Sequence, residues 1–315
     1  GYDEVSLVSL SSSDHSGIAE IVSRAMARHA QPGLAISLPS LRIDSFSVEL
    51  ARLIETCRKT GFTFAPEAGS QRLRDVINKG VTEEEILQTA KAVFSSGWRR
   101  IKLYFMLGLP TEEDEDVAEM ARLIGSLRAL GKRVLRRGVE IAVSASTFVP
   151  KPHTPFQWEP LVPRETLEQR QGLLRERARA REVKLSWSDW ESTWLEAALS
   201  RGDRRVGAVI YEAWRAGARF DAWSEHFRPD LWRGAFQRVG LDPDFYTARR
   251  RAADEVLPWS ILHTGVSGAC LRREYVRSLA GNLSPDCRFD CHACGVSTAF
   301  ASQRQGLAAS AWGCP

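Results

Sequence analysis

Hydrophobic and polar residues alternate in a regular way over the first half of the chain. Short apolar runs rich in β-branched residues predict strands at 3–10, 33–43, 62–69, 99–110 and 139–150. Apolar residues at helical spacing predict helices at 16–30, 46–60, 70–78, 82–97 and 111–130. Strand and helix in turn, without hairpin signals, indicate βαβ units and therefore a parallel sheet.

Capping residues predict where two of these helices begin. Thr82 is followed three residues later by Glu85, which predicts a capping box. Thr111 is expected to cap the next helix, which runs to about Leu130.

Five strands are too few to close an eight-stranded barrel, and the first strand is not followed by a G-x-G-x-x-G nucleotide-binding turn. The fold class that we expect is α/β, either an open parallel sheet or an incomplete (βα) barrel that lacks its first unit. Because residue 1 is Gly and a strand follows at once, the chain is expected to start inside a domain. In either fold, ligands bind at the carboxyl ends of the strands.

The pattern predicts three regions: a partial barrel at 1–160, a helical tryptophan-rich region at 161–256 and a cysteine-rich tail at 257–315. From Pro163 to about Arg251 we expect helices only. The tryptophans of this region are interpreted as core and interface anchors rather than as a base-stacking platform. They are Trp187, Trp190, Trp194, Trp214, Trp223 and Trp232.

Composition narrows the class of protein. The net charge of +4 is too balanced to indicate a nucleic-acid partner by itself. The sequence contains no apolar run of 18 residues and no signal-peptide pattern, so we expect a cytoplasmic protein without a membrane partner.

Five of the six cysteines lie in the tail, and three of them, Cys287, Cys291 and Cys294, have C-x3-C-x2-C spacing. Clustered thiols in a chain of this kind favour a metal over a disulfide scaffold. Both an iron–sulfur cluster and zinc suit thiolate ligands. A tail without metal is the alternative. The candidates for a fourth ligand are Cys270, Cys314, His292 and His263, whereas Cys57 is expected to be a core residue.

Polar residues follow the predicted strands. They include Ser12 to Asp14, Ser40 with Arg42, and Glu67 in "APEAGS". A carboxylate at a strand end needs hydrogen-bond donors, which ligand hydroxyls supply. Glu67 can equally be an acidic residue at a helix N-terminus, and its position in the sequence leaves both interpretations open.

Two longer segments resemble known motifs. "FAPEAGSQRLRDVINKG" resembles the E-x-G-S-x-R-L element of radical S-adenosylmethionine (SAM) enzymes, and "KLYFMLGLPTEEDED" resembles their G-x-P-x-E-x-x-x-D element. The chain is similar over most of its length to an uncharacterised, B12-binding-type radical SAM family that occurs beside or fused to a radical-SAM-linked domain.

The resemblance implies a TIM-barrel-like fold and a SAM site in which Glu67 contacts the ribose and the backbone at Leu107 and Gly108 approaches the adenine. The implied SAM-binding residues are Ser12, Ser13, Asp14, Ser40, Arg42, Glu67, Ser70, Leu107 and Gly108. It also implies a catalytic [4Fe-4S] cluster on a C-x3-C-x2-C motif after the first strand, reduced by a donor such as ferredoxin or flavodoxin. This chain has no cysteine before Cys57, so the fragment alone is expected to be inactive.

The sequence therefore leaves two alternative hypotheses for the function. The first is a radical SAM enzyme that cleaves SAM reductively and abstracts hydrogen from an unreactive C–H bond of an unknown substrate, with RNA or protein among the candidates. The second is a non-catalytic, metal-stapled binding protein derived from the same fold. No catalytic residue is assigned.

Overall fold

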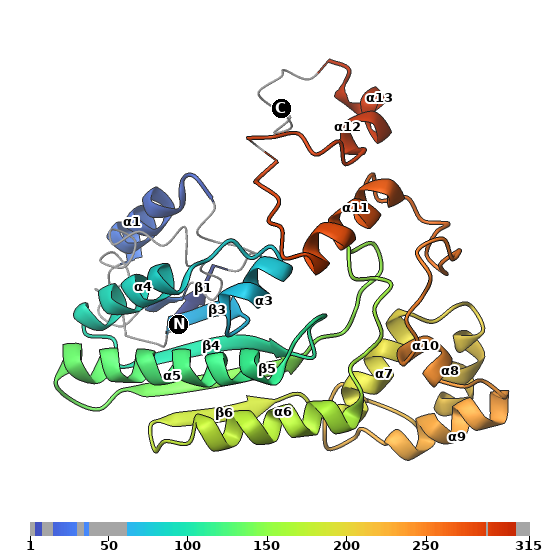
Figure 1. Cartoon of the computed structure of the whole chain (residues 1–315), viewed down its shortest axis with the longest axis horizontal. Coiled ribbons are helices and arrows are strands. Elements are labelled where there is room, and N and C mark those ends of the chain that lie inside the picture. Colours follow the sequence, from blue (N-terminus) through green and yellow to red (C-terminus); the bar gives the residue numbers. More distant parts are fainter. Residues whose placement is uncertain (1–3, 8–14, 30–34, 38–61, 288, 307–315) are drawn as a thin grey trace.

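The computed structural model describes residues 4–7, 15–29, 35–37, 62–287 and 289–306 (Figure 1). These residues form two parallel sheets. In the smaller one, β1 (Glu4–Ser6) pairs with β2 (Ala35–Ser37). The larger sheet contains β3 (Phe62–Glu67), β4 (Arg100–Leu107), β5 (Glu140–Thr147) and β6 (Val183–Trp187), all parallel and in this order. The predicted helix at 46–60, with Cys57, lies outside the described residues.

Helices connect the strands. They are α1 (Ile18–His29), α3 (Gln71–Val76), α4 (Glu83–Ser95), α5 (Asp114–Leu135) and α6 (Arg164–Arg177). In the larger sheet each strand lies beside the one before it, without the reversal of order that defines a doubly wound sheet. This consecutive order is that of a (βα) barrel, so the α/β fold with a partial barrel is confirmed.

The expectation of five strands and of helices only after Pro163 was wrong. Helix α6 is followed by β6, which pairs with β5 from Val183 to Trp187 and extends the sheet. Within "VKLSW" the hydrophobic and polar residues alternate, as they do in a strand with one buried face. The strand is short, and the charged sequence before it masked this alternation.

The structure confirms one predicted helix start and corrects the other. Thr82 and Glu85 form the expected capping box, with the Glu85 N–H 3.2 Å from the Thr82 hydroxyl. Thr111 does not cap α5, which begins three residues later with Glu113 as its N-cap. The backbone of Thr111 has a φ of +64°, so this residue turns the chain ahead of the helix.

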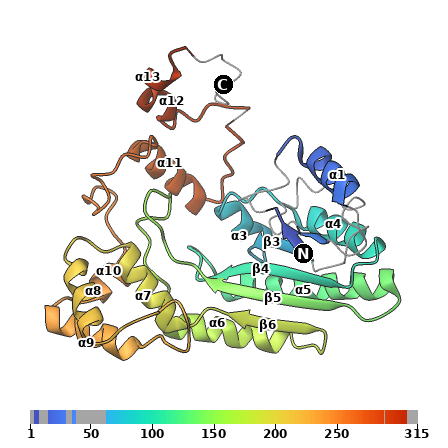
Figure 2. The ribbon, with the colours of Figure 1, turned by 180° about the vertical axis from the view of Figure 1, so that it is seen from behind.

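The larger sheet has two different faces. Along β4, Ile101, Leu103 and Phe105 are buried in the main hydrophobic core, together with side chains of α4, α5 and α6. The alternate residues, such as Lys102 and Tyr104, are more exposed and belong to the opposite face. Figure 2, seen from behind, shows β4 and β5 in front of α5.

A second core holds the helical region together. Its helices are α7 (Trp190–Ser200), α8 (Val206–Arg215), α9 (Pro229–Val239) and α10 (Asp244–Thr247). Trp194 and Trp232 are buried in this core, as expected of anchors. Trp214 and Trp223 are more than half exposed, so these two are not core residues, and their role as interface anchors stays a prediction.

The tail contains α11 (Gly268–Leu279), α12 (Val296–Ala299) and α13 (Ala301–Arg304). Leu257 and Trp259 pack on Trp158, in the loop after β5, and this contact ties the tail to the barrel. The region boundaries at 160 and 256 stay predictions, although the sheet itself continues to Trp187.

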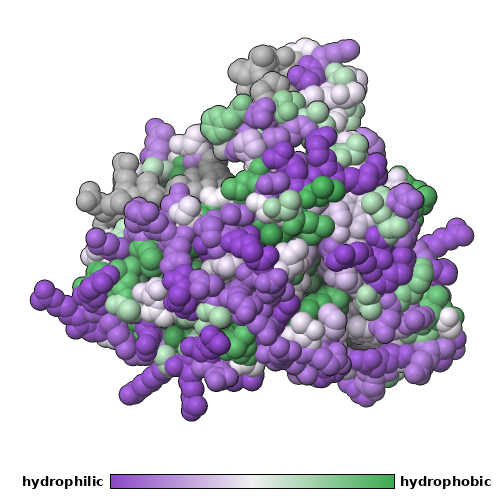
Figure 3. All heavy atoms as spheres, in the orientation of Figure 1, coloured by the Kyte–Doolittle hydropathy of each residue, from purple (hydrophilic) through white to green (hydrophobic). Residues whose placement is uncertain are grey.

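Figure 3 shows one face of the molecule, in the orientation of Figure 1. The surface of that face is mostly hydrophilic, with smaller hydrophobic patches between the charged residues. None of the described helices combines the length and the apolar character needed to cross a bilayer.

Candidate functional site

Glu67 ends β3 at the carboxyl edge of the larger sheet. Its backbone φ is +66°, and the pairing with β4 shifts register between Phe64 and Glu67. A positive φ is uncommon for a residue with a side chain, and such strain concentrates at functional sites. The Glu67 side chain is 27% exposed, and its Oε1 lies 3.3 Å from the Nζ of Lys79. Within the described part of the chain this ion pair is the side chain's one polar contact.

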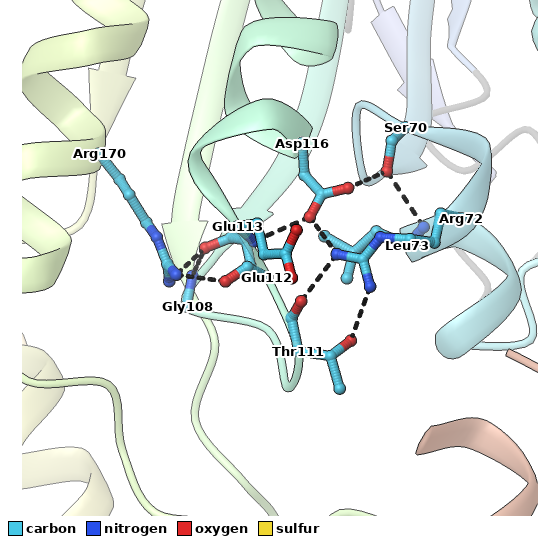
Figure 4. A network of polar contacts seen from close by, with 9 residues as sticks. All are labelled: Ser70, Arg72, Leu73, Gly108, Thr111, Glu112, Glu113, Asp116 and Arg170. Atoms are coloured by element: carbon cyan, nitrogen blue, oxygen red, sulfur yellow. Dashed lines mark hydrogen bonds and ion pairs between the residues drawn. The ribbon is translucent and has the colours of Figure 1, made fainter. Parts of the chain in front are cut away.

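The two motifs that follow β3 and β4 are bonded to each other (Figure 4). The hydroxyl of Ser70 donates a hydrogen bond of 2.5 Å to Asp116, and the guanidinium of Arg72 forms an ion pair with the same carboxylate. Arg72 also donates to the carbonyl oxygen of Thr111 at 2.7 Å. The backbone N–H of Glu113 completes the set, 2.8 Å from Asp116 Oδ2. The start of α3 is therefore fixed against the start of α5.

Asp116 is the centre of this network and stays ionised at neutral pH. Burial alone would raise the pKa of its carboxyl group, but the hydrogen bonds from Ser70, Arg72 and the Glu113 N–H outweigh burial and lower it. The same Ser70 hydroxyl accepts a hydrogen bond from the Leu73 N–H as the N-cap of α3.

Gly69 is required by packing. A Cβ built on this residue would lie 2.3 Å from the backbone of Met120 on α5, a distance that real side chains do not adopt. The glycine of the first motif therefore allows α5 to approach the turn between β3 and α3. Its role in the motif is structural.

Glu112, in the second motif, holds the loop after β4. Its Oε2 accepts a hydrogen bond of 2.7 Å from the Gly108 N–H and another of 2.7 Å from Arg170 on α6. Burial is the largest influence on this carboxyl group and raises its pKa to about 7, although Arg170 and the Gly108 N–H favour the ionised form. Glu112 therefore joins the loop to α6.

Polar residues line the less buried face of the sheet in register. Tyr104 on β4 is paired with Ser144 on β5, which in turn is paired with Ser186 on β6. Lys102, two residues before Tyr104, donates a hydrogen bond of 2.8 Å to its hydroxyl. In a barrel this face is the interior, so these side chains lie where a ligand at the barrel axis would reach them.

The sequence analysis did not identify this row. Strands in a fully covered parallel sheet read as continuous hydrophobic runs, whereas β4 ("RIKLYFML") and β5 ("EIAVSAST") alternate. That alternation was the signal for a polar interior face.

The sequence-predicted SAM residues lie in different environments. Ser12, Ser13, Asp14, Ser40 and Arg42 lie outside the described residues. The hydroxyl of Ser70 is already bonded to Asp116 and Leu73, as described above.

Leu107 and Gly108 are both buried at the end of β4. The Leu107 carbonyl accepts a hydrogen bond of 2.8 Å from Phe148, and the Gly108 N–H is bonded to Glu112. The backbone N–H of Gly108 is therefore not available to a ligand, whereas the Leu107 carbonyl keeps a second lone pair.

Glu67 differs from its neighbours in the motif. Gly69, Ser70 and Arg72 are all engaged in holding α3 against α5, whereas the carboxylate of Glu67 takes no part in that network. A partly exposed carboxylate at a strand end, held by one lysine, fits a pair of ligand hydroxyls as donors. The residues present therefore fit a ribose at this position.

The tail cysteines do not form a metal centre in the described residues. Cys287 and Cys291 are exposed and Cys294 is partly buried, and no group of three thiol, imidazole or carboxylate side chains comes together there. Cys270, at the start of α11, is buried, and burial raises the pKa of its thiol, with a smaller contribution from Cys294. The metal site at Cys287, Cys291 and Cys294 stays a prediction.

The structure describes some of the candidates for a fourth metal ligand. Cys314 lies outside the described residues. The ring of His292 contacts the carbonyl oxygen of Pro285 through Nε2 at 2.7 Å, and His263 Nδ1 accepts a hydrogen bond from Gly265 at 3.3 Å. Neither imidazole belongs to a cluster of ligands in the described part of the chain.

Comparison with known proteins agrees with this geometry. Over 210 residues, or 66% of the chain, the sequence is 30% identical to a protein of Methanocaldococcus jannaschii that is named only as uncharacterized. The chain spans 44% of that relative, which is less than half of its length. Residues 1–124, which contain both motifs, match the radical SAM superfamily.

Proposed function

We propose that this chain is the SAM-binding core of a radical SAM enzyme and that Glu67 binds the ribose of SAM. The observation that carries the proposal is the position of Glu67, a strained residue at the carboxyl edge of a partial barrel whose carboxylate is not used by the surrounding structural network. The match of residues 1–124 to the superfamily supports the same assignment.

In this proposal each group of the chain has a limited task. Glu67 accepts hydrogen bonds from the ribose hydroxyls, and Lys79 holds the carboxylate in place. The polar row of Tyr104, Ser144 and Ser186 faces the interior, where the substrate would lie. SAM, together with a reduced [4Fe-4S] cluster, supplies radical chemistry on C–H bonds, and the protein orients the reactants and excludes water.

The test is SAM affinity, measured by calorimetry with the natural full-length protein and two variants. Glu67→Ala removes the acceptor and is expected to weaken SAM binding about tenfold, the effect of losing one or two hydrogen bonds to a charged group. Glu115→Gln, at an exposed position on α5, is the matched control and should bind SAM as the natural protein does. Equal affinity of Glu67→Ala and the natural protein would reject the ribose assignment.

Further parts of the proposal concern groups outside the described site. The ligands of the catalytic cluster are not among the cysteines of this chain's barrel, and we propose that they belong to another segment of the enzyme. An electron donor such as ferredoxin or flavodoxin is required for the reduction. A radical-SAM-linked domain is the proposed partner, and RNA or protein is the proposed class of substrate.

We also propose an auxiliary metal site at Cys287, Cys291 and Cys294, holding an iron–sulfur cluster or zinc. Three thiols within eight residues of chain supply enough ligands, and metal binding would draw the exposed side chains together. Metal content per chain should fall in Cys291→Ser but not in Cys270→Ser if these three thiols alone are the cysteine ligands. Visible absorption distinguishes an iron–sulfur cluster from zinc.

The second candidate is a non-catalytic binding protein stapled by metal at the tail. It is favoured by the three spaced thiols of the tail, which can hold a metal away from the barrel. Anaerobic reconstitution of the full-length protein with iron and sulfide separates the two. Release of 5′-deoxyadenosine from SAM under reducing conditions supports the enzyme, and tail metal without SAM cleavage supports the binding protein.

A further inference from the structure

A cavity of about 330 Å³ lies at the same edge of the sheet, between the end of α3, the loop after β5 and helix α11. In both ribbon views α11 lies close to α3 (Figures 1 and 2). The volume of the cavity is at the lower end of the range of small-molecule pockets. It can hold a ring-sized group but not a whole macromolecule.

One wall of the cavity is apolar and already assembled. Met106, Phe148 and Phe156 line it, and all three are only partly buried. The rings of Phe148 and Phe156 meet edge to face, with their centroids 5.8 Å apart. A small core that contains Leu73 packs behind these side chains and holds them in place. An apolar ligand would complete the burial of these side chains, which is the main source of affinity in such pockets.

On the opposite wall, Asn78, Ser284 and Glu274 are bonded to one another. The Ser284 N–H donates a hydrogen bond of 3.0 Å to the side-chain oxygen of Asn78, and the Ser284 hydroxyl donates one of 2.5 Å to Glu274. These contacts connect the tail to the end of α3. Each of these three side chains therefore already has a partner within the protein.

The cavity adjoins the proposed SAM site through consecutive residues. Asn78 lines the cavity, and Lys79, the next residue, forms the ion pair with Glu67. Met106 on β4 immediately precedes Leu107 at the strand end. A ligand in the cavity would therefore lie beside the ribose-binding residue, where a radical enzyme needs its substrate.

We propose that this cavity is the substrate pocket and that it takes an apolar group of the substrate, about the size of one aromatic ring. Its identification as the substrate pocket rests on the proposed function. Its preference for an apolar, ring-sized ligand rests on the cavity alone.

Methionine methyl NMR tests the pocket directly. The chain has three methionines, of which Met106 lines the cavity and Met120 is buried in the main core. The protein is labelled with 13C-methyl methionine, its signals are assigned with Met106→Leu and Met120→Leu, and indole is added as the probe. We expect the Met106 signal to shift with a Kd on the order of 1 mM, while the Met120 signal stays in place.

Two controls sharpen the result. Glucose, a polar molecule of ring size, should leave the Met106 signal unchanged. Asn282→Trp places bulk at an exposed residue of the lining and should abolish the response to indole, and Thr154→Leu serves if the first variant does not fold. No Met106 shift up to about 10 mM indole, an equal shift with glucose, or an unchanged response in a folded plugged variant would overturn the proposal.

The outcome is independent of SAM binding. A Met106 response in a protein that does not bind SAM keeps the apolar pocket and rejects the proposed function. SAM binding that is lost in Glu67→Ala, without any Met106 response, keeps the proposed function and rejects the pocket.

Discussion

Arg170 on α6 donates a hydrogen bond of 2.7 Å to the carboxylate of Glu112, which lies 58 residues earlier in the loop after β4. The Glu112 side chain is completely buried and that of Arg170 is 11% exposed. Such a pair is costly to bury, and here it fixes the position of the loop after β4. That loop contains Gly108 and is bonded to the first motif through Arg72 and the carbonyl oxygen of Thr111.

The first prediction is a fall in stability with rising pH that depends on Glu112. The pKa of its carboxyl group in the folded protein is about 7, above the ordinary value of 4.5, so the folded state keeps a proton that the unfolded state gives up. The protonated Glu112 carboxyl group contributes up to ~3 kcal/mol to the free energy of unfolding. This contribution is complete below pH 4.5 and is lost as the pH rises through 7.

Denaturation in urea at pH 5, 6, 7 and 8 measures this slope. Glu112→Gln cannot ionise and should flatten the slope between pH 5 and 7. Glu115→Gln, at an exposed position on α5, should leave the slope as it is. An unchanged slope in Glu112→Gln would assign the pH dependence to another group.

The second prediction concerns the pair formed by Asp116 and Arg72. Asp116→Ala leaves Arg72, the Ser70 hydroxyl and the Glu113 N–H without their shared acceptor and should cost about 3 kcal/mol. Arg72→Ala should cost less, because that side chain is 46% exposed. A double-mutant cycle should give a coupling of about 1–2 kcal/mol, and a value near zero would contradict the ion pair.

The Asp116 contribution also has a defined pH dependence. Its pKa in the folded protein lies below the ordinary value of 3.8, so the stabilisation is present above that pH and is lost as the pH falls through the lower value. Acid denaturation of Arg72→Ala should therefore begin at a higher pH than that of the natural protein.

The third prediction compares a glycine that packs against α5 with a glycine of α5 that faces open space. Gly69→Ala would place a Cβ 2.3 Å from the backbone of Met120 and should destabilise the fold by about 3 kcal/mol or more. Gly125→Ala, within α5 and with no atom within 4 Å of the added Cβ, should instead stabilise it by about 0.5–1 kcal/mol. Thermal unfolding of the two variants checks both signs, and equal effects would show that α5 packs differently.

The sequence predicted the fold where local pattern decides it. Thr82 and Glu85 lie in one turn, so their capping box is readable from spacing, and the parallel sheet follows from the alternation of strands and helices. Contacts between distant segments were not readable. Neither motif shows by itself that Ser70 would be bonded to Asp116, 46 residues later.

The site was predictable to the same extent. Glu67 was named from its motif, but its freedom from the network around it is a property of the folded protein. The cysteine spacing shows which side chains could bind a metal. The geometry of a metal site depends on the conformation of the exposed tail, which the spacing does not give. The polar row at Tyr104 and Ser144 was readable from period-two alternation and was missed.

The last prediction concerns the link between the barrel and the tail. Asn78 has a φ of +51° and accepts the hydrogen bond from Ser284, which is 206 residues away. Asn78→Gly keeps the left-handed backbone but removes the acceptor, so the Ser284 amide should exchange with solvent about fivefold faster, while the free energy of unfolding changes by less than about 1 kcal/mol. Asn78→Ala also strains the backbone and should lower that free energy by about 1 kcal/mol more.

Hydrogen-exchange mass spectrometry of peptides that cover residues 282–287 measures this link. Asn282→Ala, which changes an exposed asparagine of the tail itself, is the control and should leave exchange at Ser284 unchanged. Full protection in Asn78→Gly would mean that the tail is held by its other contacts, such as those of Leu257 and Trp259 with Trp158. Faster exchange in Asn78→Gly alone would show that one side chain beside the proposed SAM site holds the wall of the pocket.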